Sequence, residues 1–259
     1  MGRIDQARSG YLTQDISASL GAHSKTAIKN SISHKEGHLS SFNLPEIILG
    51  GQDGLVNVLG VILGVAAATS DSRIVIVAGL AATFAESVSM AAVAYTSKIA
   101  EADYYQSEYE REKWEIEYIP RGEEEEIRAL YKSYGFKGKV LEGIVKTIIA
   151  DKKLWLKVMM EQELKLTPVE RKQAIPDAII VGVSAIIGSI IPLSAYLFFP
   201  ITSATVLSLA ISSLTLFVVG YYKAQKTLGR KFVKSGVEMM VIGIVSALVG
   251  YLIGTILKV

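Results

Sequence analysis

The chain has 259 residues, of which 50% are hydrophobic and 20% are charged, and its mean hydropathy is +0.36. A soluble chain of this size cannot bury that much apolar surface, so the composition excludes an ordinary soluble domain. Its 27 basic and 25 acidic residues nearly cancel, which indicates no nucleic-acid partner, and the lack of cysteine excludes disulfides and thiolate metal sites.

Residues 1–43 are polar, so we expect an N-terminal tail without a cleavable signal peptide. Beyond the tail, five apolar stretches have about the 20 residues that a helix needs to cross a ~30 Å hydrocarbon core. They lie near Ile47–Ala68, Ile74–Ser97, Ala174–Phe199, Ile201–Tyr222 and Gly236–Leu257. The sequence therefore predicts an all-α polytopic membrane protein, with transmembrane helices 1 and 2 in residues 44–97 and helices 3 to 5 in residues 173–259.

The segment between the second and third spans, residues 98–172, holds 16 of the 25 acidic and 15 of the 27 basic residues. No Gly or Pro interrupts it before Pro120, so we expect the second span to continue as a helix up to that residue. Pro120–Gly122 predicts a turn, followed by a helix ending at Gly135 and by one or two more before Pro168. The segment is predicted to be a helical lobe outside the lipid.

Basic residues predict the orientation of the spans. They occur in the N-terminal tail and between the fourth and fifth spans, at Arg3, Arg8, Lys25, Lys29, Lys35, Lys223, Lys226, Arg230, Lys231 and Lys234. The two short hairpin loops carry only Arg73. Because cytoplasmic loops are enriched in Lys and Arg, we expect the N-terminus and the 98–172 lobe in the cytoplasm and the C-terminus outside.

Three acidic residues, Asp53, Glu86 and Glu238, fall within or at the edge of predicted spans. An intramembrane carboxylate costs at least ~2.5 kcal/mol, so it must face a cavity or a partner. Asp53 lies one turn from Asn57, and Glu86 shares a helix face with Met90, which places a carboxylate and a thioether together. The alternatives are polar contacts between helices and, for Glu238, an ion pair with Lys234.

Glycine pairs four residues apart predict close helix packing, either within the chain or at a dimer interface. They are Gly50 and Gly54, Gly60 and Gly64, and Gly250 and Gly254.

The lobe carries glutamates at helical spacing, Glu108, Glu112 and Glu115, and then Glu123 and Glu126. Like charges so placed repel, so either basic side chains or divalent cations must offset them. Further along, Met159 and Met160 lie one turn before Glu163; thioethers beside a carboxylate suit a borderline ion such as Fe²⁺ better than Mg²⁺ or Ca²⁺. A solvated charged face and two core methionines are the alternative.

Histidine contributes little to these predicted sites. No histidine lies beyond residue 38, so the Glu-x-x-His pairs of ferritin-like di-iron sites are absent, and His34 and His38 are an incidental pair.

Several motifs together resemble the vacuolar iron transporter (VIT) family. They are Gly-Gly-Gln-Asp-Gly-Leu-Val-Asn at residues 50–57, Ala-Glu-Ser-Val-Ser-Met at residues 85–90, the Tyr104–Glu117 helix, Met159-Met160-x-x-Glu163, and Ser-Gly-Val-Glu-Met-Met at residues 235–240. The resemblance covers residues 44–257. It implies a homodimeric multi-pass protein of a prokaryotic plasma membrane or an organellar membrane, without a cofactor or an enzymatic activity.

The same resemblance implies the transported ions and the site residues. Fe²⁺, with Mn²⁺, Co²⁺ and Zn²⁺ as related ions, would leave the cytosol in exchange for protons. Asp53, Glu86 and Met90 match the translocation site. The lobe ligands are matched by Glu112, Glu115, Glu123, Glu126, Met159, Met160 and Glu163, whereas Asn57, Glu108 and Glu238 are weaker candidates.

Two other function classes compete with a transporter. A membrane-anchored metal sensor or iron-storage buffer would use the lobe alone, but an anchor has no need for Asp53 and Glu86 at lipid depth. A membrane ferroxidase is disfavoured by the missing histidines.

Overall fold

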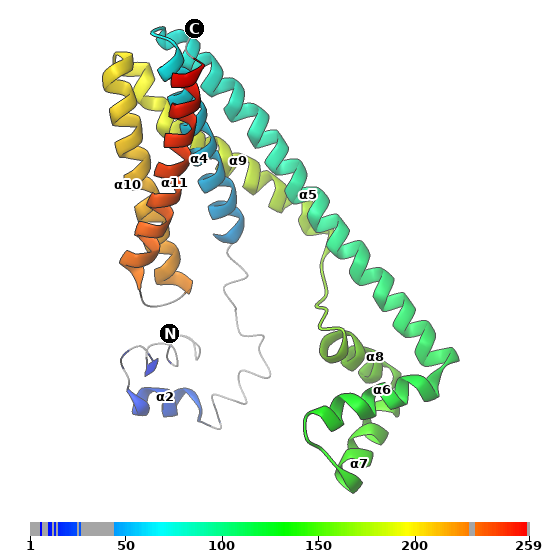
Figure 1. The fold of residues 1–259 in the computed structure, drawn as a ribbon. Helices are drawn as coiled ribbons and strands as arrows, with labels where there is room; N and C mark the ends of the chain where they lie inside the picture. The colour runs from blue at the N-terminus through cyan, green and yellow to red at the C-terminus, as the bar shows by residue number, and fades with distance from the viewer. Residues whose placement is uncertain are drawn as a thin grey trace. The chain divides into compact units, whose positions relative to one another are not determined.

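The computed structural model describes residues 44–227 and 231–257 without a break, and residues 6, 10, 11, 13, 15–24 and 26 before them. Over these ranges the chain is helical, with no strand (Figure 1). The tail residues Arg3, Arg8, Lys25, Lys29, Lys35, His34 and His38, together with Arg230, lie outside the described residues.

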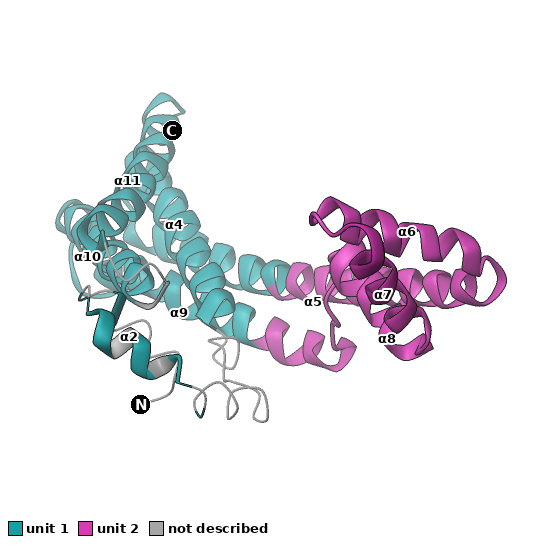
Figure 2. Ribbon diagram, turned by 90° about the horizontal axis from the view of Figure 1, so that it is seen from below, with its two compact units in different colours: residues 1–90, 180–259 teal, residues 91–179 magenta. Residues whose placement is uncertain are grey.

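The chain divides into two compact units, residues 1–90 with 180–259, and residues 91–179 (Figure 2). Among the described residues, five helices are long and apolar enough to cross a membrane, as predicted. They are α4 (Leu44–Ala68), α5 (Ser72–Tyr118), α9 (Ala174–Phe198), α10 (Ile201–Thr227) and α11 (Phe232–Ile256); a short helix, α2 (Ile16–Ala22), precedes them. Helix α10 ends later than the predicted span, and helix α11 begins earlier. Both extensions contain lysine, which is a good helix former and lets the helical backbone continue beyond the apolar stretch.

Glycines set the packing of α4 inside the first unit. A Cβ atom on Gly54 would lie 2.3 Å from the backbone oxygen of Ala185 in α9, and one on Gly254 in α11 would lie 1.9 Å from that of Gly64. Only glycine permits such backbone contact between helices. Of the two predicted uses of these glycines, the structure shows packing within the chain.

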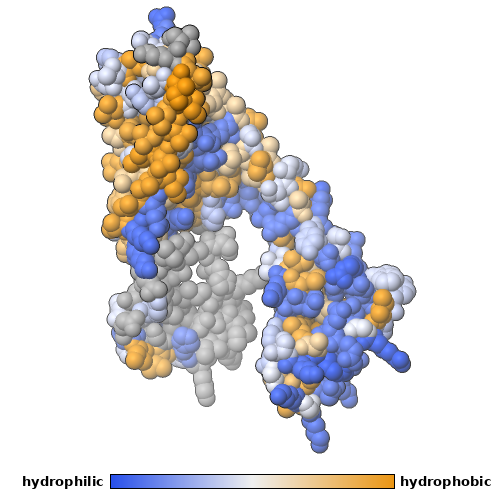
Figure 3. Space-filling model, in the orientation of Figure 1, coloured by the Kyte–Doolittle hydropathy of each residue, from blue (hydrophilic) through white to orange (hydrophobic). Residues whose placement is uncertain are grey.

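Large apolar side chains cover the outside of this unit. The visible face of α10 and α11 is largely apolar (Figure 3). The exposed side chains of these two helices include Val206, Leu214, Val218, Val241, Ile242, Val245 and Leu252. Such a surface is costly in water and favourable in hydrocarbon, which agrees with helices that face lipid.

The second unit has a hydrophobic core of its own. It contains the C-terminal part of α5, then α6 (Pro120–Ser133), α7 (Gly138–Ile149), α8 (Lys152–Val158) and the π-helix η2 (Met159–Glu163). The core side chains are Ile116, Ile127, Leu141, Val145, Ile148, Trp155, Leu156, Val158, Met159 and Met160. On α7, Leu141, Val145 and Ile148 recur at the spacing of one helix face, so that face packs inward.

The turn predicted at Pro120–Gly122 is wrong, because α6 begins at Pro120 itself. Proline is accepted at the first helical position, where its missing N–H has no partner in any case. The predicted end of this helix is nearly correct. Gly135 follows the last turn with φ +95°, and the N–H of Phe136 donates to the carbonyl of Tyr131, a glycine-dependent helix end.

Candidate metal sites

Three polar side chains meet between α4 and α5 in the first unit. The side-chain amide of Asn57 donates a hydrogen bond of 2.7 Å to Glu86 Oε1, and Asp53 lies close enough to interact with the same carboxyl group. Asp53 and Glu86 are half-buried, and Asn57 is exposed on the surface of the single chain. The structure thus brings together Asp53, Glu86 and Asn57, the last of which was only a weak candidate.

The other membrane candidates have different surroundings. Met90 is half-buried one turn beyond Glu86 on α5. Glu238 lies 3.7 Å from Lys234 Nζ, so the ion pair that the sequence offered as an alternative is present. Both residues of that pair are largely exposed, and an exposed pair of this kind contributes little energy.

The lobe gathers three glutamates into one cluster. Each of Glu112, Glu115 and Glu123 offers a carboxylate oxygen, and the three oxygens lie within 4.8 Å of one another. The chain brings them together because α5 ends at Tyr118 and α6 starts at Pro120, so Glu123 in the first turn of α6 returns toward Glu112. Three carboxylate oxygens at this separation can coordinate one divalent cation.

Two of these glutamates are buried without full hydrogen bonding. Glu112 is 1% exposed and Glu123 is 4% exposed. Within the described part of the chain, Oε2 of Glu112 and Oε2 of Glu123 have no hydrogen-bond partner. A buried carboxylate oxygen without a partner is costly, and a bound cation would remove that cost.

Burial also changes the acidity of the cluster. Burial, followed by the charge of Glu112, raises the pKa of Glu123 to about 8. Burial raises the pKa of Glu112 as well, although the charge of Arg111 acts in the opposite direction. Without metal, Glu123 therefore keeps a proton at neutral pH, and a cation that binds there must displace it.

Glu126 and Glu163 lie at the edge of the cluster. Partial desolvation, followed by the charge of Glu126, raises the pKa of Glu163; the charge of Arg111 acts against this, and that of Glu115 adds to it. Helix α6 packs against the π-helix that carries Glu163, which explains why these two glutamates interact. Both are exposed to solvent, unlike Glu112 and Glu123.

Met159 and Met160 lie in the hydrophobic core of the lobe, with exposed fractions of 0% and 2%. They belong to the π-helix, in which the N–H of Leu164 donates to the carbonyl of Met159. Short π-helical segments are frequent at functional sites. The burial of Met159 and Met160 shows that they pack in the core, which was one of the two roles that the sequence left open. Metal ligation by their sulfurs remains a prediction.

Sequence reasoning did not single out Arg111, which contacts the cluster directly. Its Nη2 lies 2.8 Å from Glu108 Oε2 and 2.6 Å from Glu112 Oε1, and its Nη1 contacts Glu115. The spacing of Arg111 to Glu108 and Glu115, three and four residues, could have indicated the contact. The weak candidate Glu108 therefore serves as a partner of Arg111 in this structure.

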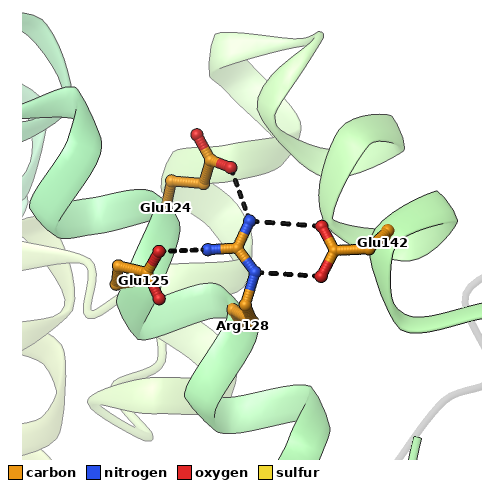
Figure 4. Close-up of polar contacts among 4 residues, drawn as sticks. All are labelled: Glu124, Glu125, Arg128 and Glu142. Atoms are coloured by element: carbon orange, nitrogen blue, oxygen red, sulfur yellow. Dashed lines mark hydrogen bonds and ion pairs between the residues drawn. The ribbon is translucent and has the colours of Figure 1, made fainter. Parts of the chain in front are cut away.

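A second arginine binds a separate set of glutamates. Arg128 on α6 contacts Glu124 and Glu125 on its own helix and Glu142 on α7 (Figure 4). None of these three glutamates belongs to the predicted ligand set. Arg128 thus offsets the charge of Glu124 and Glu125 and links α6 to α7.

Comparison with known proteins identifies relatives along most of the chain. Residues 44–255 match the model of the VIT family. A vacuolar iron transporter of Plasmodium falciparum (isolate 3D7) is 33% identical over 98% of this chain and 96% of its own length. Vacuolar iron transporter 1 of Tulipa gesneriana is 30% identical over 84% of this chain and 89% of its own length, and that of Arabidopsis thaliana is 30% identical over 87% and 90%.

Proposed function

This chain belongs to the VIT family, and on that premise we propose that it moves Fe²⁺ out of the cytosol in exchange for protons. The observation that carries the proposal is the pair of carboxylates, Asp53 and Glu86, in helices apolar enough to cross a membrane. Carboxylates at lipid depth are costly and are kept for ion pathways. A carboxylate must lose its proton to bind metal, so metal and protons compete for this pair.

The lobe captures metal from the cytosol in this proposal. Glu112, Glu115 and Glu123 form the centre of the site, with Glu126, Glu163, Met159 and Met160 as further ligands. Thioether sulfur favours Fe²⁺, Co²⁺ or Zn²⁺ over Mg²⁺ and Ca²⁺, which prefer oxygen. The buried, unpartnered oxygens of Glu112 and Glu123 support a cation at this position.

Two further parts of the proposal concern the membrane. The basic residues flanking the spans support a cytoplasmic lobe and N-terminus, with the C-terminus on the other side, in a prokaryotic plasma membrane or an organellar membrane. A homodimer is supported by Asn57, which is exposed beside Asp53 and Glu86 on a single chain. In lipid such polar groups need cover, and a second copy would supply it.

Flux into liposomes tests the transport. The full-length protein is reconstituted, and entry of Fe²⁺ or Co²⁺ is followed with a trapped dye, with and without a pH gradient. We expect the gradient to accelerate flux, and Asp53→Asn or Glu86→Gln to abolish it in protein that still inserts. Asp71→Asn is the matched control, because Asp71 caps α5 from a loop and asparagine caps equally well. Wild-type flux in either membrane variant would contradict the assignment.

Metal binding tests the lobe. We expect Glu112→Gln combined with Glu123→Gln to remove the lobe's metal binding by calorimetry on the full-length protein. Glu124→Gln combined with Glu125→Gln replaces the same number of carboxyl groups, at contacts of Arg128, and should leave binding unchanged.

A second function, a membrane-anchored metal sensor or storage buffer, is favoured by one observation. The lobe is a compact unit with its own core and its own carboxylate cluster. Metal binding by the lobe without any metal flux through reconstituted protein would select this function over transport.

A further inference from the structure

Arg111 occupies the solvent side of the lobe cluster and holds three carboxylates at once. Its guanidinium contacts Glu108, Glu112 and Glu115, and its side chain is 44% exposed. A guanidinium presents its N–H groups in a planar fork, so it can bridge several carboxylates without moving. Arg111 thus supplies positive charge at the cluster.

The partners of Arg111 overlap with the predicted metal ligands. Glu112 and Glu115 contribute to both sets, whereas Glu123 belongs only to the metal cluster. Oε1 of Glu112 contacts Arg111, while Oε2 of the same carboxylate is buried and unpartnered. Two of the predicted metal ligands, Glu112 and Glu115, are therefore also ligands of Arg111. In Glu112 one oxygen contacts Arg111, and the other is left for a metal ion.

We propose that Arg111 is a resident counter-cation of the lobe site that a divalent ion must displace from Glu112 and Glu115. The inference rests on the proposed function of the lobe. An arginine cannot lose its charge in a protein, so it repels any cation that enters beside it. Arg111 thus weakens metal binding and limits how long the ion stays, which suits a site that passes its ion on.

Arg128 provides a built-in comparison. It also contacts three glutamates of the lobe, but none belongs to the metal cluster (Figure 4). Loss of either arginine removes one positive charge from the same unit. Only the loss of Arg111 removes it from the predicted ligands.

Calorimetry on the full-length protein in detergent tests the proposal. Zn²⁺ and Co²⁺ are titrated at pH 8 into variants that also carry Asp53→Asn and Glu86→Gln, so that lobe binding alone is measured. We expect Arg111→Gln to bind at least tenfold more tightly than the parent. Arg128→Gln should stay within about threefold of the parent. Arg111→Lys keeps the charge but loses the planar fork, so its affinity should fall between those of the parent and Arg111→Gln. Unchanged or weaker binding by folded Arg111→Gln protein would overturn the proposal.

A measurement on the wild-type chain does not depend on how the variants fold. Phenylglyoxal modifies free guanidinium groups, and mass spectrometry measures its reaction at each arginine. We expect Zn²⁺ to accelerate modification of Arg111 and to leave Arg128 unchanged; no acceleration at Arg111 would refute displacement. If the parent lobe binds no metal at all, the proposed metal-binding function of the lobe fails, whereas metal binding without an arginine effect defeats only this inference.

Discussion

The side-chain amide of Asn57 on α4 donates a 2.7 Å hydrogen bond to the carboxylate of Glu86 on α5. The bond joins two consecutive helices of the membrane unit at the residues predicted to lie on the ion pathway. A neutral amide can orient a carboxylate without neutralising its charge, which leaves the charge for a cation or a proton. We therefore expect Asn57 to position the Glu86 carboxylate beside the predicted site.

Replacing Asn57 by alanine should therefore impair transport without unfolding the protein. Removing a group that orients a metal ligand through a hydrogen bond lowers affinity or activity by about 10–100-fold, so we expect flux to fall roughly tenfold or more. Interhelical hydrogen bonds in membranes average only ~0.6 kcal/mol, so thermal stability in detergent should change little. Asn57→Gln, which keeps the amide, should retain part of the flux. Equal flux in wild type and Asn57→Ala would show that the bond has no role in transport.

Met90→Leu should change ion preference more than packing. The substitution keeps volume and apolarity, so stability should change by less than ~1.5 kcal/mol. Removal of the thioether should lower Fe²⁺ flux about tenfold. Loss of a group that supports a metal site lowers metal affinity or activity by about 10–100-fold, and this expectation takes the smaller value. Flux of Fe²⁺ and Mg²⁺ is compared in the same liposomes. An Fe²⁺-to-Mg²⁺ preference that does not change would assign Met90 to packing alone.

The stability of the metal-free protein should fall as pH rises. Burial and neighbouring charge raise the pKa of Glu123 from 4.5 to about 8, so the folded state binds this proton more tightly than the unfolded chain. The resulting stabilisation is complete below about pH 4.5 and is lost progressively up to about pH 8.

Thermal unfolding in chelator at pH 5.5, 7 and 8.5 measures this dependence on the full-length protein. Glu123→Gln should reduce the slope between pH 5.5 and 8.5, because glutamine cannot titrate. Glu142→Gln removes a carboxyl on Arg128 and should leave the slope as it is in wild type. A slope unaffected by Glu123→Gln would contradict the assignment of the proton to Glu123.

Two glycine substitutions should have opposite effects on stability. A Cβ on Gly254 would meet the backbone of Gly64, so Gly254→Ala should destabilise the membrane unit by about 1–3 kcal/mol. Gly143 on α7 has open space around its position, so Gly143→Ala should stabilise the protein by about 0.4–1 kcal/mol. Unfolding of both variants in detergent checks the pair, and a stable Gly254→Ala protein would exclude tight α4–α11 contact.

The sequence by itself determined the five long helices and the helical lobe, because apolar length and charge content are properties of a contiguous segment. It also singled out Asp53 and Glu86, since a carboxylate inside an apolar stretch is unusual whatever the tertiary structure. The lobe glutamates stand out for a different reason, which is their spacing along single helices. The start of α6 was missed because Pro120 favours both a turn and a first helical position, and neighbouring residues do not decide between them.

Only the tertiary structure decided which side chains meet across helices. The bond between Asn57 and Glu86 depends on the relative rotation of α4 and α5, and neither helix specifies that rotation alone. The burial of Glu112 and Glu123 depends on how α6 returns along α5, which a local pattern does not contain. Whether the glycines of α4 contact α11 or another copy likewise depends on packing between distant segments, because a glycine pair fits any close-packed helix equally well.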